Sequence, residues 1–171
     1  MGHKYAIFGI YSVYNTYVVR YLIMVQRSDK TDEGETLLAR LRHELAHPPF
    51  HALLAPQAVS VDVQTNSVVI RLPFNERLRH SATTNHIHGG VIAALIDMAA
   101  HAAVAVQIGR VAPTIDLRID YLRPAPGVDL YATARTIRVG RSIARADVEV
   151  CGEGTPPLAV GRGTFSTLAS A

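Results

Sequence analysis

The chain has 171 residues, of which 49% are hydrophobic and 18% charged. This composition suits a single domain with a real hydrophobic core and excludes wholesale disorder. The formal net charge of +3 comes from scattered basic residues and not from a block of like charge, so we expect no nucleic-acid partner. The single cysteine, Cys151, excludes an internal disulfide and fits a cytoplasmic location.

The N-terminal segment is apolar and rich in tyrosine from Tyr5 to Val25, long enough to resemble a membrane helix. No small-residue cleavage site follows it. It is interrupted by Asn15, Thr16 and Arg20. We therefore expect residues 1–35 to form an extension of uncertain structure that does not span a membrane, and residues 36–171 to form the functional domain.

The first elements of that domain are a short helix and a hairpin. Leucines at helical spacing predict the helix after residue 36, and Pro48 and Pro49 end it. Residues 58–65 and 67–74 alternate or are β-branched, and Asn66 is predicted to form the turn between them. Residues 75–85 are polar and are predicted to form a loop.

The segment from His86 to Gly109 reads HIHGGVIAALIDMAAHAAVAVQIG and predicts a long helix that is apolar on nearly every side. Such a helix must be enclosed by the rest of the fold. Four strand-like segments follow; in the first, Ile115, Leu117, Ile119 and Tyr121 share one face. One long helix with many antiparallel strands predicts an α+β fold, in which a curved antiparallel sheet wraps around the central helix.

Two glycines open the long helix. A helix N-terminus presents unpaired N–H groups and a partial positive charge, and Gly89 and Gly90 have no side chain to block a ligand oxygen. The arrangement could stabilise the oxyanion of an acyl-transfer intermediate. The alternative is that the glycines only let the helix begin close to the sheet.

Asp97 is the one acid in this apolar helix, and burying a carboxylate is costly unless it is paired or functional. It could pair with His101 one turn later, or act as a general base or nucleophile on a carbonyl. Asp97 lies eight residues, about 12 Å, after Gly89, so one helix could hardly place both groups on one reacting carbonyl. Two antiparallel copies of the helix across a two-fold axis could, which predicts a homodimer with two composite sites.

The other groups of residues give weaker evidence for a function. No cysteine or carboxylate completes a usual metal-ligand spacing with the histidines, so no metal site is expected. The histidines concerned are His80, His86, His88 and His101. No G-x-S-x-G elbow is present, so a serine-hydrolase route has no support.

The motif HGGVIAALID, from His88 to Asp97, resembles the hotdog-fold acyl-CoA thioesterases of the PaaI-like branch. The segments PTIDLRIDYLRPA, VGRSIARADVEV and GRGTFST are similar to later strands of that family, and the likeness covers about Leu37 to Leu168. The resemblance implies a hotdog fold, a dimer commonly paired into a homotetramer, and hydrolysis of acyl-CoA. It implies no cofactor, since coenzyme A is part of the substrate.

The resemblance also assigns roles to residues by position. Asp97 would be the base or nucleophile, and Gly89 would supply the oxyanion-hole N–H, helped by Gly90. His88 would border the thioester, and Thr114 would orient the attacking water.

Substrate-binding positions match the family less closely. Many relatives carry an asparagine several residues before HGG; here Asn85 is only three before His88, and Ala82 lies nearer the usual position. Arg123 and Arg141 occupy loop positions that could bind the CoA phosphates, or could be solvated arginines at strand ends.

Two rival functions stay open at this point. One is a hotdog hydratase or dehydratase acting on enoyl thioesters, which would normally pair a histidine with an acid. The other is a non-catalytic module that binds acyl-CoA. The length or aromaticity of the acyl group is also left open by the residues.

Overall fold

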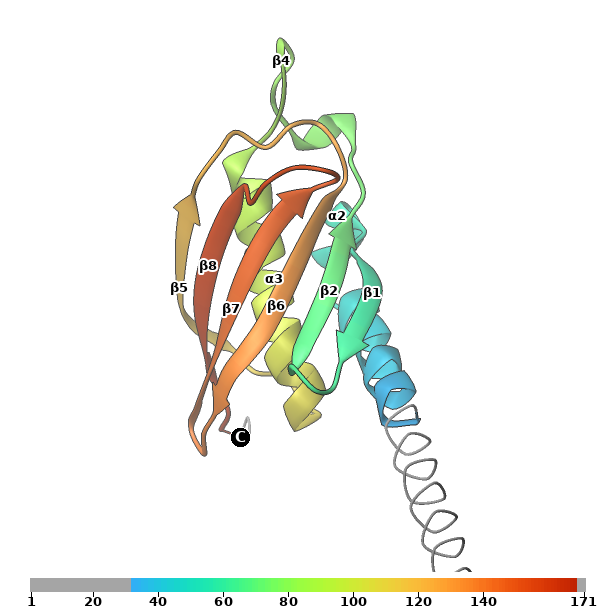
Figure 1. Ribbon diagram of the computed structural model, residues 1–171, viewed down its shortest axis with the longest axis vertical. Helices are drawn as coiled ribbons and strands as arrows, with labels where there is room; N and C mark the ends of the chain where they lie inside the picture. Colours follow the sequence, from blue (N-terminus) through green and yellow to red (C-terminus); the bar gives the residue numbers. More distant parts are fainter. Residues whose placement is uncertain (1–31, 169–171) are drawn as a thin grey trace, which may run out of the picture. The chain divides into compact units, whose positions relative to one another are not determined.

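The computed structural model describes residues 32–168 (Figure 1). A helix covers residues 32–46, and a single helical turn, α2 (His51–Leu54), follows the two prolines. Contacts divide the chain between Glu35 and Thr36, and the unit that begins at Thr36 holds all the elements described below. The apolar segment from Tyr5 to Val25 lies outside the described residues.

One six-stranded antiparallel sheet and one long helix make up the body of this unit (Figure 1). The strand order is β1-β2-β6-β7-β8-β5, so β5 forms one edge. The helix α3 (Gly89–Ile108) packs on one face of the sheet against β2, β5, β6, β7 and β8. The strands are β1 (Gln57–Asp62), β2 (Ser67–Leu72), β5 (Thr114–Tyr121), β6 (Leu130–Val139), β7 (Ile143–Gly152) and β8 (Ala159–Ser166). The predicted α+β architecture is confirmed.

Small residues let the sheet approach α3 closely. Burial alternates along β6 and β7, and the inward positions include several alanines, such as Ala132, Ala134 and Ala146. They face an alanine-rich helix whose Leu95 and Ile96 are fully buried. By length and composition α3 could cross a bilayer, but most of it is buried inside the fold, as in the core helix of a soluble domain.

Gly161 on β8 lies close to α3 and gives the first testable prediction. A Cβ there would lie 2.5 Å from Ile96 Cγ2 on α3 and 3.1 Å from the Arg118 carbonyl oxygen on β5. We expect Gly161→Ala to destabilise the fold by about 1–3 kcal/mol through overpacking. Thermal unfolding measures this, with Gly89→Ala as control, because its Cβ would meet only Tyr121 atoms at 3.5 Å or more. Equal melting temperatures for the two variants would contradict the prediction.

The segment predicted as a polar loop is more ordered than expected. It contains a 3-10 turn, η1 (Glu76–Leu78), and a small hairpin of β3 (Arg79–Ser81) and β4 (Thr84–Ile87). The Asn75 side chain accepts a hydrogen bond from the Arg77 N–H at 3.0 Å and caps the turn. The hairpin is mostly polar, so it lacks the apolar alternation by which strands are recognised.

A β-bulge near the start of β5 corrects the predicted face of that strand. Thr114 pairs with Phe165 and Asp116 pairs with Thr164, so Ile115 is the extra residue. Beyond the bulge Leu117 and Ile119 pack against the core as predicted, but Ile115 is 58% exposed. A one-residue insertion reverses the side-chain alternation, and it therefore turns Thr114 toward α3 in place of Ile115.

Candidate active site

The N-terminus of α3 is capped by a histidine side chain. His88 is the N-cap, and its Nδ1 accepts a hydrogen bond from the Gly90 N–H at 2.9 Å. The Gly89 N–H has no hydrogen-bond partner within residues 32–168. The cap therefore already uses the Gly90 N–H, and the Gly89 N–H is the donor without a partner at this helix end.

Tyr121, at the far end of β5, holds the same peptide from the other side. Its hydroxyl donates a hydrogen bond to the Gly89 carbonyl oxygen at 3.0 Å. The peptide between Gly89 and Gly90 is therefore fixed at its C=O by Tyr121 and at its N–H by His88. Sequence reasoning placed Tyr121 only on an apolar strand face, and nothing local shows that its hydroxyl reaches the helix.

Asp97 lies half-buried in the middle of α3, and its partner is a hydroxyl. Thr114 Oγ1 donates a hydrogen bond to Asp97 Oδ1 at 2.9 Å. His101 does not pair with Asp97; its Nε2 instead accepts the Ala112 N–H at 3.3 Å. Of the two alternatives, the His101–Asp97 pair is therefore absent. Oδ2 of Asp97 has no hydrogen-bond partner in the described part of the chain.

The two halves of the motif stay apart within one chain. Gly89 and Asp97 are separated along the helix by about 12 Å. Each is hydrogen-bonded to a different end of β5: Thr114, which begins the strand, binds Asp97. Tyr121, which ends the strand, binds Gly89. The other edge of β5 is unpaired in the sheet, and Tyr121 and the next residue, Leu122, are about half exposed.

Asn85 lies shortly before the N-terminus of α3, but its contacts are with Gly127. Its side chain occupies the space that a Cβ at Gly127 would need, and its backbone carbonyl oxygen accepts a hydrogen bond from the Gly127 N–H at 2.8 Å. These contacts fix the loop before β6. The structure therefore does not bring the Asn85 amide together with Asp97 and Thr114.

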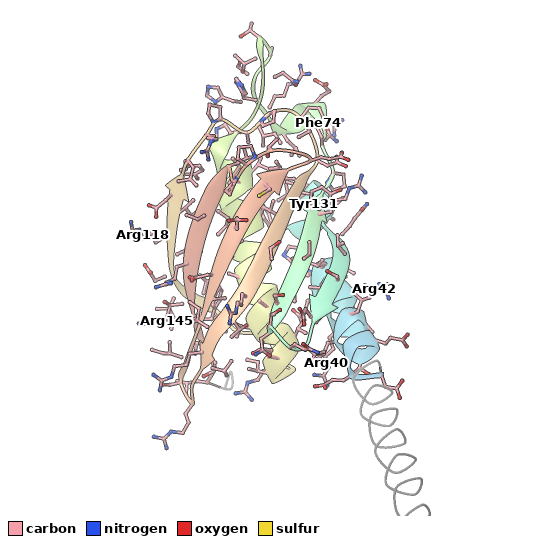
Figure 2. The ribbon with its side chains drawn as sticks, in the orientation of Figure 1. Arg40, Arg42, Phe74, Arg118, Tyr131 and Arg145 are labelled. Atoms are coloured by element: carbon pink, nitrogen blue, oxygen red, sulfur yellow. The ribbon has the colours of Figure 1, made fainter. Side chains whose placement is uncertain are left out.

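The two predicted phosphate-binding arginines lie on different turns. Arg123 follows β5 and donates a hydrogen bond to the Pro157 carbonyl oxygen at 2.6 Å. Arg141 is exposed in the turn between β6 and β7, where Arg138 and Arg145 line the same depression of about 380 Å³ (Figure 2 labels Arg145). No carboxylate lines this depression. Arg138 and Arg145 were not predicted as binding residues from the sequence. Their positions close to the predicted turn, one on each side of it, could have indicated them.

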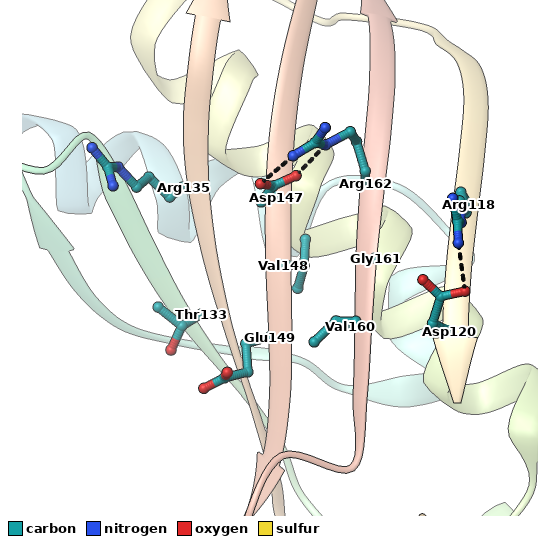
Figure 3. Close-up of a pocket in the computed structure, with 10 residues that line it drawn as sticks. All are labelled: Arg118, Asp120, Thr133, Arg135, Asp147, Val148, Glu149, Val160, Gly161 and Arg162. Atoms are coloured by element: carbon teal, nitrogen blue, oxygen red, sulfur yellow. Dashed lines mark hydrogen bonds and ion pairs between the residues drawn. The ribbon is translucent and has the colours of Figure 1, made fainter. Parts of the chain in front are cut away.

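A wider depression of about 620 Å³ lies on the outer face of the sheet, away from α3 (Figure 3). Its charges are mixed, and the clearest pair is Arg162 with Asp147, joined by two hydrogen bonds of 2.6 and 2.7 Å. It contains none of the motif residues. Within residues 32–168 no group of three His, Cys, Asp or Glu side chains could hold a metal ion.

Comparison with known proteins identifies the family. A family model described as thioesterase superfamily matches residues 84–159. A candidate esterase of Halobacterium salinarum is 37% identical over 127 residues, which cover 67% of this chain and 83% of that protein. The chain belongs to the thioesterase superfamily.

Further similar proteins extend this likeness. The medium/long-chain acyl-CoA thioesterase YigI of Salmonella typhimurium is 35% identical over 95 residues, covering 46% of this chain and 61% of that protein. A crystal structure from the thioesterase superfamily matches with a TM-score of 0.73 and 29% identity, over 78% of this chain and 99% of the other. The Escherichia coli PaaI structure, at 22% identity, shares the fold with a TM-score of 0.65, over 77% of this chain and 98% of that one. The predicted hotdog fold and the resemblance to this family are confirmed.

Proposed function

We propose that this thioesterase-superfamily protein hydrolyses acyl-CoA thioesters to a free acid and coenzyme A. The proposal rests above all on the half-buried Asp97, bonded to Thr114, on the helix whose N-terminus presents the Gly89 N–H. A carboxylate and an oxyanion donor are the two groups that thioester hydrolysis needs. The name of the YigI relatives supports an acyl-CoA substrate.

The active unit in this proposal is a homodimer formed along β5. Antiparallel pairing of two β5 edges about a two-fold axis sets the Thr114 end of one strand beside the Tyr121 end of the other. Asp97 of one copy then faces Gly89 of the second copy, twice per dimer. The unpaired edge and the exposed Ile115 and Leu122 favour this pairing, because such an edge is normally covered. Pairing of two dimers into a tetramer stays a prediction.

Hydrolysis would proceed through Asp97 in one of two ways. As a general base, its carboxylate takes a proton from a water whose oxygen attacks the thioester carbon. As a nucleophile, it attacks that carbon itself and forms an anhydride, which water then cleaves. In both cases the carbonyl oxygen gains negative charge beside the Gly89 N–H, and the CoA thiolate leaves and is protonated. Because Thr114 binds Oδ1, Oδ2 is free for the reaction, and Thr114 orients the carboxylate.

The experiment that tests this function is a thiol-release assay over short, long and aromatic acyl-CoAs. We expect release of free CoA with at least one class. Loss of the enoyl ultraviolet band of an enoyl-CoA without thiol release would instead identify the hydratase. Tight acyl-CoA binding with no turnover would identify a binding module.

The arginines give a prediction about substrate recognition. We propose that Arg123 and the cluster around Arg141 bind the CoA phosphates, since forked guanidinium donors match phosphate oxygens. Arg141→Ala should then raise KM for acyl-CoA roughly tenfold, as expected for loss of one charge-assisted contact. The same variant should leave KM unchanged for the matching acyl-pantetheine, which lacks the nucleotide. Arg77→Ala, an exposed arginine on η1, is the control; equal changes with both substrates would contradict the assignment.

A further inference from the structure

We infer that His101 is a positioning residue that holds Thr114 against Asp97; this inference rests on the proposed function. Asp97 and His101 are one turn apart on α3, and each binds the segment that enters β5. Asp97 Oδ1 accepts from the Thr114 hydroxyl at 2.9 Å, and His101 Nε2 accepts from the Ala112 N–H at 3.3 Å. Two neighbouring side chains of one helix thus fix residues 112 and 114.

This segment needs fixing because its register decides which side chain meets Asp97. Thr114 is followed at once by the bulge residue Ile115. A slip by one residue would replace the hydroxyl with an aliphatic side chain that cannot donate a hydrogen bond. The backbone just before the bulge is held from both sides: His101 binds the Ala112 N–H, and the Ser166 N–H on β8 donates to the Pro113 carbonyl at 2.8 Å. His101 provides the link to α3.

The link requires a neutral imidazole, because Nε2 must accept while the proton lies on Nδ1. The surroundings favour that form. Burial lowers the pKa of His101 below its ordinary value, and His51 on α2 acts in the same direction. Glu44 on the first helix and Asp97 oppose the shift. The Phe165 ring on β8 packs against the imidazole in a tilted, edge-type arrangement, with ring centroids 6.2 Å apart.

Protonation would break the link, because Nε2–H and the Ala112 N–H would then be two donors facing each other. The direction of the pH dependence follows from the lowered pKa of His101. The link is intact at neutral pH and persists below the ordinary imidazole range. It is lost only as the pH falls through the lowered value.

The test compares His101→Gln with His101→Leu. A glutamine carbonyl can reach the Ala112 N–H and does not titrate, whereas leucine has no acceptor. We expect His101→Leu to lower kcat roughly tenfold, for one hydrogen bond lost, with little change in KM. His101→Gln should stay close to wild type in both constants. Gln107→Leu, elsewhere on α3, is the control and should change neither constant.

A double-mutant comparison separates positioning from a general structural role. If His101 acts through Thr114, the His101→Leu change should cost nothing further in a Thr114→Val background. An equal loss in both backgrounds would overturn the inference.

An NMR titration of the full chain tests the inference without measuring turnover. The Ala112 amide signal should shift at the pH where the His101 ring titrates, and should not shift there in His101→Gln. If this coupling is observed but the protein releases thiol from no acyl-CoA, the proposed function is refuted and the link between His101 and Ala112 is retained. An Ala112 signal that ignores His101 would refute the link even in an active thioesterase.

Discussion

Asp97→Asn is expected to lower kcat for acyl-CoA hydrolysis by roughly 10³-fold, in the range for loss of a positioned base. Asparagine has almost the same shape, and its carbonyl oxygen can still accept the Thr114 hydroxyl bond seen at 2.9 Å. The substitution therefore removes basicity and nucleophilicity while leaving the local geometry in place. The fold and the dimer should be unchanged.

Thiol release at saturating acyl-CoA measures the effect, and thermal unfolding and light scattering verify fold and assembly. Asp147→Asn is the matched control, because Asp147 also accepts hydrogen bonds but lies on the outer face of the sheet, away from α3, where it pairs with Arg162. Its kcat should stay within about twofold of wild type, as for a surface ion pair. An Asp97→Asn variant that kept a tenth of wild-type activity would show that the carboxylate is not the reacting group.

A mixed dimer of Asp97→Asn and Gly89→Pro chains is expected to recover about half of wild-type activity, because one of its two composite sites is intact. Proline removes the Gly89 N–H and suits the first position of a helix. His88, with φ −63° and ψ 135°, already has the extended conformation required before proline. Alone, Gly89→Pro should lose roughly 10²–10³-fold in kcat, the usual cost of one oxyanion-hole donor.

Co-expression with two affinity tags yields the mixed dimer for the thiol-release assay. Gly89→Ala is the control for the single substitution, because it adds a methyl group but keeps the N–H; the added Cβ would make only ordinary contacts with Tyr121. If both groups acted within one chain, the mixed dimer would contain no intact site and would be as inactive as its parents. That result would refute the composite site and with it the proposed role of the β5 edge.

Much of the fold was predictable because its signals are local. The apolar run over α3, the alternation along β6 and β7 and the turn at Asn66, whose φ is +53°, are each visible within a few residues. The boundaries of these elements were close to those observed. The small β3–β4 hairpin was missed because its residues are polar and its pairing is set by the turn before it.

The sequence by itself placed an acid at Asp97 and a glycine at Gly89 on one helix, because helical spacing fixes residues that share an element. Only the tertiary structure decided what surrounds them. Thr114 reaches Asp97 because of a bulge that the two-residue strand period cannot reveal. Tyr121 reaches the Gly89 carbonyl across two elements, and the Gly90 N–H is already used by His88. Each of these contacts depends on packing or backbone register, which the order of residues alone does not contain.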